Sequence, residues 1–225
     1  GFAYQSLGQL AQRDPATLEE HKLELSKQCF EALKIEPPGV RSAVQETVNC
    51  LSNCFSGRRE DEEDEEGSAT DGGALAVRDL LTQYIKSDSA AVRQAALHWW
   101  IWVYPFSDCG ARFHCILLSS DSNVNISDLA REGLDAEKVL SFQRSKGRVA
   151  LECVYPRIGD MLAAIAAERP SLVGDRRSTR PMTELAMPAA SMEAMIGFLR
   201  NLSAREPQGA LDDDGLSLYF SVLTA

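Results

Sequence analysis

The sequence predicts an all-α protein, a HEAT- or armadillo-like α-solenoid of antiparallel helix pairs. Apolar residues recur at the helical period through most of the 225 residues. A string also recurs, because EPPGVRSAVQETV from Glu36 returns as SDSAAVRQAALHW from Ser87, with valine, arginine and alanine at matching places. A repeated turn followed by an amphipathic helix is typical of stacked helical-repeat proteins.

Three helices are expected in a first HEAT-like region, residues 1–57. The first ends before Asp14-Pro15, because the residue before a proline disfavours the helical conformation. Pro37-Pro38-Gly39 separates the second helix from the third, so these two should form an antiparallel hairpin. The expected bounds are about 2–13, 19–34 and 40–55.

Residues 58–73 are predicted to form a disordered acidic loop. Glu60 to Glu66 are seven consecutive acidic residues, and the loop contains no apolar residue larger than Ala69. Such a segment buries too little apolar surface to offset the entropy of ordering it. We expect a solvated spacer, and a contact with a specific basic partner is the alternative.

The helical period returns in a second HEAT-like region, residues 74–135. A helix at about 74–86 is followed, after the turn at Ser87-Asp88, by a second helix that should pair with it. Another pair is expected at about 111–118 and 124–134.

Residues 136–225 are expected to carry further helical repeats. The helical period is blurred between Leu134 and Pro156. Apolar residues continue to Ala225, so we expect one continuous solenoid segment of a longer protein. The predicted elements are a helix at about 156–169, a loop near 171–187, a helix at about 188–204 and a last helix from about 212.

The predicted pairs share a register. In each of them an apolar residue lies seven positions before a valine at the start of the second helix. The valines are therefore predicted to occupy equivalent structural positions in successive repeats. The three spacings are Leu33 to Val40, Ile85 to Val92 and Leu117 to Val124.

An arginine follows the valine in the first two pairs, at Arg41 and Arg93. Identical placement in successive repeats indicates a structural role, with a bond to an acid or a carbonyl of the neighbouring repeat, in preference to ligand binding. The third pair has Asn125 at this place, so the series is imperfect.

The run Trp99-Trp100-Ile101-Trp102 covers more than one face of a helix. Most such aromatic runs belong to a core or to packing between repeats. Trp99 continues the buried stripe, so Trp100 or Trp102 is the candidate for an exposed contact with a partner protein.

Neither a metal nor a cofactor is expected. The six cysteines lie mostly among apolar residues in helical segments, which favours free thiols in a reducing compartment. Cys50 and Cys54 lie one helical turn apart, and a zinc site completed by Cys109, His114 and Cys115 is the alternative. No CxxC or HxxxH pair completes a zinc site, however.

The sequence also favours a protein without enzymatic activity. It contains no Gly-x-Ser-x-Gly, phosphate-loop or HExxH motif. A cysteine hydrolase using His114 and Cys115 is the alternative, although adjacent helical residues point in different directions.

The charge of the chain limits its partners. The net charge of −10 disfavours nucleic acid, because binding phosphate requires a basic surface. Without Glu60 to Glu66, 26 acidic residues remain against 23 basic ones. The most apolar window, 95–106, is too short to insert into a membrane, and no targeting peptide is visible. We expect a soluble chain with protein partners.

Several segments resemble the large HEAT-repeat adaptor and scaffold family associated with the proteasome. The resemblance is most specific between Tyr84 and Asp108, and it corresponds to part of the N-terminal half of that family. The segments that carry it are YQSLGQLAQRDP from Tyr4, CFEALKIEPPGVRSAVQETV from Cys29, LLTQYIKSDSAAVRQAALHWWIWVYPFSD from Leu80, YPRIGDML from Tyr155 and MPAASMEAMIGFLRNL from Met187.

The resemblance implies a non-enzymatic adaptor that binds subunits of the proteasome core and regulatory particles. Such a protein would bridge the two particles and stabilise or monitor the holoenzyme. It would be found in the cytoplasm and nucleus, and at endomembranes through its partners. The alternative is a HEAT-repeat carrier for nuclear transport or other cargo, which the helical repeats and the acidic character also suit.

Overall fold

The computed structural model describes residues 1–55, 71–145, 154–168 and 187–205. These residues form α-helices, short 3₁₀ helices and turns, and no β-strand occurs among them. The prediction of an all-α protein is therefore confirmed for the described part of the chain. The chain divides into two compact units, Gly1–Tyr104 and Pro105–Ala225.

In the first unit, prolines determine where several helices begin. Pro15 opens a 3₁₀ turn directly after α1, and Pro38 is the first residue of α3, where its missing N–H costs no helical hydrogen bond. The helices are α1 (Phe2–Arg13), α2 (Lys22–Ile35), α3 (Pro38–Leu51), α4 (Asp71–Tyr84) and α5 (Ala90–Val103), with 3₁₀ helices η1 (Pro15–Leu18) and η2 (Ser52–Phe55).

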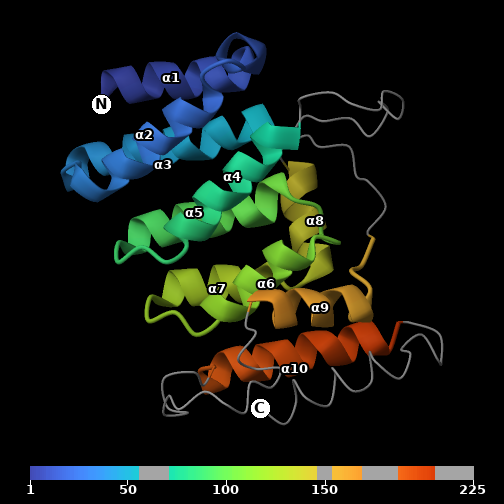
Figure 1. Cartoon of the computed structure of the whole chain (residues 1–225). Helices are drawn as coiled ribbons and strands as arrows, with labels where there is room; N and C mark the ends of the chain where they lie inside the picture. Colours follow the sequence, from blue (N-terminus) through green and yellow to red (C-terminus); the bar gives the residue numbers. More distant parts are fainter. Residues whose placement is uncertain (56–70, 146–153, 169–186, 206–225) are drawn as a thin grey trace, which may run out of the picture. The chain divides into compact units, whose positions relative to one another are not determined.

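These helices pack as hairpins (Figure 1). Short links join α2 to α3 and α4 to α5, and the two helices of each pair are in contact. The second pair packs on the first, because α5 contacts both α2 and α3 while α4 contacts α2. Helix α1 lies against α3.

Aromatic side chains join the two pairs. The ring of Phe30 on α2 stacks on Tyr84 of α4, with centroids 4.7 Å apart, and meets the edge of Trp99 on α5 at 5.3 Å. The indole N–H of Trp99 donates to the carbonyl of Val48 on α3, at 2.9 Å. Four helices therefore share one core. Aromatic stacking, edge contacts and the hydrogen bond of the Trp99 indole stabilise this core.

In the second unit, α6 is the central element, since α7, α9 and α10 all contact it. Asparagine or aspartate caps begin its first helices: Asp108 accepts from Ala111 N, and Asp135 accepts from Glu137 N. The helices are α6 (Cys109–Leu118), α7 (Val124–Glu132), α8 (Ala136–Ser145), α9 (Ile158–Glu168) and α10 (Ala189–Ser203).

Helix α8 lies between Leu134 and Pro156, where no helix was predicted from the sequence. Its residues Ala136, Val139 and Leu140 follow the spacing of an amphipathic helix, so the sequence pattern was present over a short helix and was overlooked. The carboxylate of Asp135 accepts hydrogen bonds from Glu137 N and Lys138 N, at 3.0 and 3.3 Å. This N-cap was a further sequence signal that could have revealed the helix.

Other element bounds need small corrections or fall outside the described residues. Helix α4 begins at Asp71, so the last three residues of the predicted loop 58–73 are helical. The rest of that loop, nearly all of the loop predicted near 171–187, and the helix predicted from about 212 lie outside the described residues.

Candidate functional site

Arg41 and Arg93 each donate hydrogen bonds to carbonyls in the turn of their own helix pair. Arg41 Nη2 donates to the carbonyl of Glu36 at 2.9 Å, and Arg93 Nη1 donates to the carbonyls of Ser87 and Asp88 at 2.8 and 3.0 Å. These acceptors lie in the turn just after the first helix of each pair. Carbonyls at helix C-terminal ends lack intrahelical donors, so a cation there is stabilising.

These arginine bonds correct one detail of the prediction. A bond to the neighbouring repeat was expected from Arg41 and Arg93, whereas the observed acceptors lie five or six residues earlier in the chain, within the same pair. The equivalent placement of the two arginines reflects an equivalent contact in both pairs.

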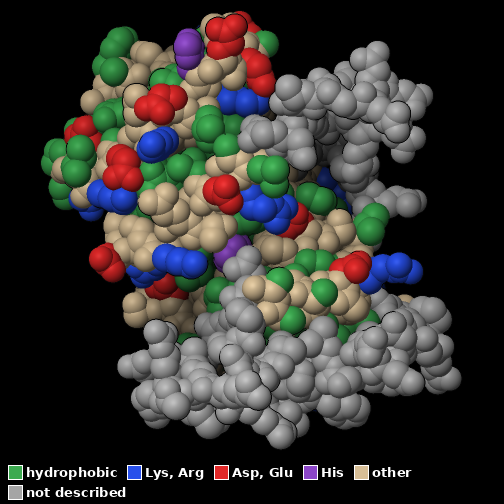
Figure 2. All heavy atoms as spheres, viewed as in Figure 1, with side chains coloured by type: hydrophobic (Ala, Val, Ile, Leu, Met, Phe, Trp, Pro, Cys, Tyr) green, Lys and Arg blue, Asp and Glu red, His purple; other side chains and the backbone are tan. Residues whose placement is uncertain are grey.

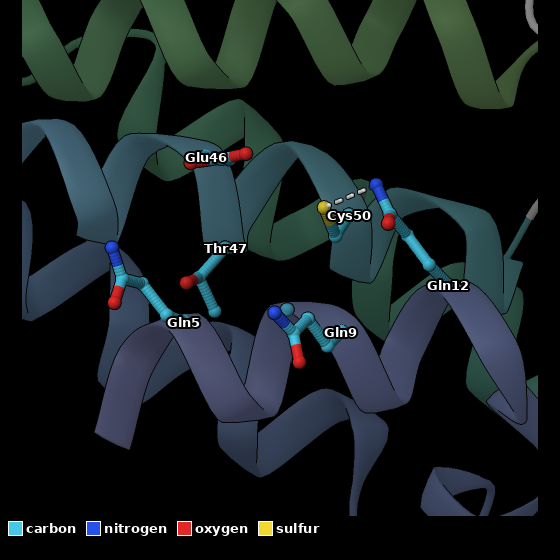
Figure 3. A pocket seen from close by; sticks show the side chains of 7 residues that line it. Gln5, Gln9, Gln12, Glu46, Thr47 and Cys50 are labelled. Atoms are coloured by element: carbon cyan, nitrogen blue, oxygen red, sulfur yellow. Dashed lines mark hydrogen bonds between the residues drawn. The ribbon is translucent and has the colours of Figure 1, made fainter. Parts of the chain in front are cut away.

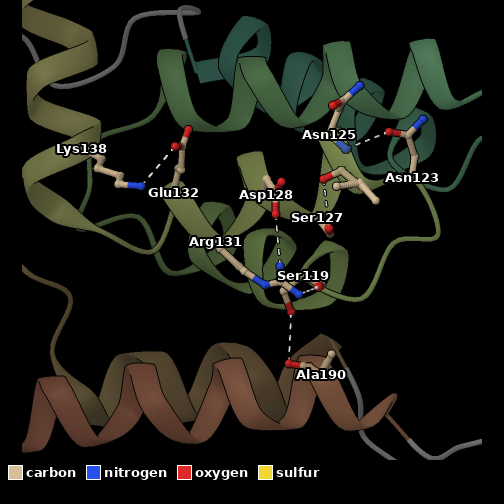
Figure 4. Close-up of polar contacts among 10 residues, drawn as sticks. Ser119, Asn123, Asn125, Ser127, Asp128, Arg131, Glu132, Lys138 and Ala190 are labelled. Carbon is tan, nitrogen blue, oxygen red and sulfur yellow. Dashed lines mark hydrogen bonds and ion pairs between the residues drawn. The ribbon is translucent and has the colours of Figure 1, made fainter.

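In the second unit a different arginine bonds the same kind of carbonyl. Arg131 Nη2 donates to the carbonyl of Ser119, which follows α6, at 3.2 Å, and Arg131 Nη1 pairs with Asp128 at 3.2 Å (Figure 4). Arg131 comes from the last turn of α7, whereas Arg41 and Arg93 lie in the first turn of their helices. Asn125, predicted at the equivalent place, lies in the N-terminal turn of α7, where its N–H donates to Asn123.

The three repeat valines are not equivalent. Val40 is half-buried and Val92 is fully buried, but Val124 is 69% exposed. Val40 and Val92 are each the third residue of their helix, whereas Val124 is the first residue of α7. The third residue of α7 is Ile126, which is fully buried. The predicted register of the third pair is therefore wrong by two residues.

The prediction of an exposed tryptophan is also wrong. Trp100 is 1% exposed and Trp102 is 4% exposed. The indole of Trp102 donates to Asn53 Oδ1 at 3.2 Å, while Trp100 lies against Tyr104 with centroids 4.7 Å apart. Helix α5 contacts α2, α3, α4 and η2, so several of its faces are covered. These tryptophans stabilise the core, and their burial removes the reason to assign them a partner.

The cysteines have the properties of core residues. Cys29, Cys50, Cys54 and Cys115 are buried free thiols, Cys109 is half-buried, and Cys153 lies outside the described residues. Burial raises the pKa of Cys29 to about 11 and likewise raises the pKa of Cys115. A raised pKa removes the thiolate that nucleophilic attack or metal binding requires. No group of three metal-binding side chains occurs within the described ranges.

The described residues on one face of the molecule carry side chains of both charge signs. On the face that Figure 2 presents, lysine and arginine side chains are interspersed with acidic ones, and the described residues there form no continuous basic patch. Among the helices that the structure describes, none has the length and apolar character needed to cross a lipid bilayer.

A shallow groove of about 230 Å³ lies between α1 and α3 (Figure 3). Its walls are mostly polar, and Gly8 forms part of the floor, where a Cβ would be 3.4 Å from Thr47 Cα. Sequence reasoning missed this site, because the glutamines that line it look like an ordinary solvated helix face. The lining side chains are those of Gln5, Gln9 and Gln12 on α1 and Glu46, Thr47 and Cys50 on α3.

Taken together, the described residues define a protein of packed helical hairpins, in which side chains bond the carbonyls of the turns and four of the five described cysteines are buried. The family described as "Proteasome component ECM29, N-terminal" matches residues 1–117, which is more than half of the chain. The chain belongs to this family. The match covers the whole first unit and continues through most of α6. A search of curated proteins and a search of solved structures each found no match.

Proposed function

We propose that this chain is a HEAT-like segment of an adaptor that binds the proteasome, bridges its core and regulatory particles, and stabilises or monitors the holoenzyme. The single observation that carries the proposal is the family match over residues 1–117, because that family is described as a proteasome component. The resemblance of the block from Tyr84 to Asp108 supports the same assignment.

The repeat-like arrangement of the first unit supports the HEAT-like part of this proposal. Two hairpins, α2 with α3 and α4 with α5, stack on each other and share a buried or half-buried valine and a turn-closing arginine at the same helical positions. Neighbouring pairs that bury a common core are the building principle of solenoid proteins.

A solenoid suits a bridging role for a physical reason. Stacked helix pairs present a long surface, so one chain can contact several subunits at once. When one contact forms, the others become effectively intramolecular, and several weak contacts can then hold two particles together. The protein would act by binding alone, without a catalytic group. It would follow the proteasome in the cytoplasm and nucleus, and reach endomembranes through partners.

Affinity purification of the full-length protein tests the proteasome assignment. We expect subunits of both the core and the regulatory particle to co-purify with it, and a carrier for nuclear transport would instead co-purify with basic cargo or a small GTPase. Consistent absence of proteasome subunits would contradict the assignment.

A second experiment tests bridging separately from binding. Purified holoenzyme is exposed to increasing salt with and without the full-length protein, and native gels measure the fraction in which both particles remain joined. Bridging predicts that the particles separate at a higher salt concentration when the protein is present. Equal separation in both samples would leave an associated protein that does not bridge.

A further inference from the structure

We propose that the groove between α1 and α3 binds an extended peptide segment that carries basic side chains, contributed by a partner protein. The proposal rests on the side chains that line the groove, on their spacing along α1 and on one uncompensated carboxylate. It does not depend on the proteasome assignment.

The walls of the groove offer unused hydrogen-bonding groups. Gln5 and Gln9 are exposed, and their side-chain amides form no hydrogen bond with any residue in the described ranges. Gln12 uses one N–H on Cys50 Sγ, at 3.1 Å, which fixes its direction along the groove (Figure 3). A glutamine amide both donates and accepts. A row of such amides therefore matches the alternating N–H and C=O groups of a main chain.

The spacing of the glutamines fits an extended chain. Gln5 and Gln9 are four residues apart on α1, which corresponds to a rise of about 6 Å along a helix. Two residues of an extended strand span roughly 6.6 Å. The two amides can therefore meet main-chain groups of alternate peptide residues, whose side chains point to the same side.

The position of α1 on α3 is fixed closely enough to keep the groove in shape. The hydroxyl of Thr47 lies 2.7 Å from the carbonyl of Tyr4 on α1, and the phenol of Tyr4 donates to Glu36 Oε1 at 2.9 Å. Gly8 has no side chain, so the floor stays open at a place where a Cβ would be 3.4 Å from Thr47.

The charge and size of the groove narrow the class of ligand. Glu46 is the only charged residue lining it, is exposed, and forms no ion pair with the other described residues. A lysine or arginine on the peptide would complement this carboxylate. The volume of about 230 Å³ is below the roughly 300 Å³ at which small-molecule sites begin, so the groove can hold only one or two residues of a peptide that lies across it.

The test uses the 225-residue chain labelled with ¹⁵N, whose glutamine side-chain NH₂ groups give separate NMR signals. The probe is an acetylated and amidated TKTKT peptide, and threonine is chosen because it favours extended backbone. We expect the side-chain signals of Gln5 and Gln9 to move in a saturable manner. The acidic peptide TETET should leave them unmoved.

Two variants link these shifts to the groove. Gln9→Leu replaces the amide with an apolar side chain of similar size, and Glu46→Lys reverses the charge of the carboxylate. Each variant should weaken TKTKT binding by about fivefold, the equivalent of about 1 kcal/mol. The matched controls are Gln83→Leu on α4 and Glu20→Lys, both at exposed positions, and they should leave binding unchanged.

Several results would overturn the proposal. These are an absence of shifts, equal shifts with TETET, or unchanged binding by both groove variants. Equal shifts with acetyl-lysine amide at the same concentration would reveal a site for a bare cation, and would rule out recognition of the peptide main chain.

Discussion

At the scale of single residues, the turns of the helix pairs are held by side chains that donate to main-chain carbonyls. Arg41, Arg93 and Arg131 each bond a carbonyl that follows a helix, and Trp99 bonds the carbonyl of Val48. Only the bond to Val48 is fully buried, where water cannot replace a lost donor; the arginine bonds are partly buried, so losing one of them costs less free energy. Two predictions at this scale use the fact that all three tryptophans lie in α5, so their fluorescence reports the first unit.

Replacing Arg93 by methionine should destabilise the first unit by about 0.5–1 kcal/mol, because methionine keeps part of the apolar stem but removes the donor to the partly buried carbonyl of Ser87 and to the exposed carbonyl of Asp88. Urea unfolding followed by tryptophan fluorescence measures the change. Arg13→Met is the control, since Arg13 is exposed at the end of α1 and should have little effect. Equal midpoints for Arg93→Met and the parent chain would show that the arginine bond is not stabilising.

The raised pKa of Cys29 predicts a loss of stability in alkaline solution. The thiol stays protonated in the folded state up to its pKa of about 11, whereas an unfolded cysteine ionises near pH 8.5. The unfolded state therefore loses its proton first, and the stability present below pH of about 8.5 declines as the pH rises toward about 11. Cys29→Ala should remove about 1–2 kcal/mol of this decline in urea unfolding. Identical pH slopes for the two proteins would contradict the assignment of the decline to Cys29.

At the scale of elements, sequence patterns located most helices because prolines and apolar stripes mark their ends and faces. Pro15 and Pro38 placed the limits of α1 and α3 closely. The register of α7 was not predictable from apolar spacing, because its cap at Asn123 shifts the buried third position to Ile126. The burial of Trp100 was not predictable from the stripe of α5 alone, since it depends on how many neighbours surround that helix.

The residues of the candidate groove could not be predicted from the sequence either. Gln5, Gln9 and Gln12 lie on the polar side of α1, and nothing in their own spacing indicates that Glu46 of α3 lies opposite them. Only the close approach of the two helices at Gly8 brings these side chains together. Contacts between elements distant in sequence therefore decide which polar residues form a site.

The docking of α1 on α3 should depend on the size of the side chain at residue 8. An alanine Cβ would be 3.4 Å from Thr47 Cα and Oγ1, which is ordinary contact, and alanine favours helix over glycine by about 1 kcal/mol. Gly8→Ala should therefore be neutral or slightly stabilising. Gly8→Leu should release α1, because the extra atoms meet the backbone of α3. Hydrogen exchange of the α1 amides measures docking, with Ala3→Leu at an exposed position as the control. If the α1 amides of Gly8→Leu stayed fully protected from exchange, the docking of α1 would not depend on the size of residue 8.

At the scale of the whole molecule, the chain combines two compact units with a family match that extends beyond the first of them. The sequence predicted one continuous solenoid, in which each repeat is stabilised by its neighbours. The first unit nevertheless encloses its own aromatic core, since Phe30, Tyr84 and Trp99 pack on one another within residues 1–104. An experiment can therefore decide whether the first unit is stable by itself or requires the second unit.

We expect residues 1–104 to fold alone. The hairpins α2 with α3 and α4 with α5 bury the same core, and the indole bonds of Trp99 and Trp102 have their acceptors, Val48 and Asn53, inside this unit. The isolated unit should show helical circular dichroism, blue-shifted tryptophan emission and one cooperative urea transition. Trp99→Ala should abolish that transition or lower its midpoint strongly, because removing a buried tryptophan costs about 3–5 kcal/mol. A red-shifted emission without a cooperative transition would instead show that the first unit requires its neighbour, as a continuous solenoid would demand.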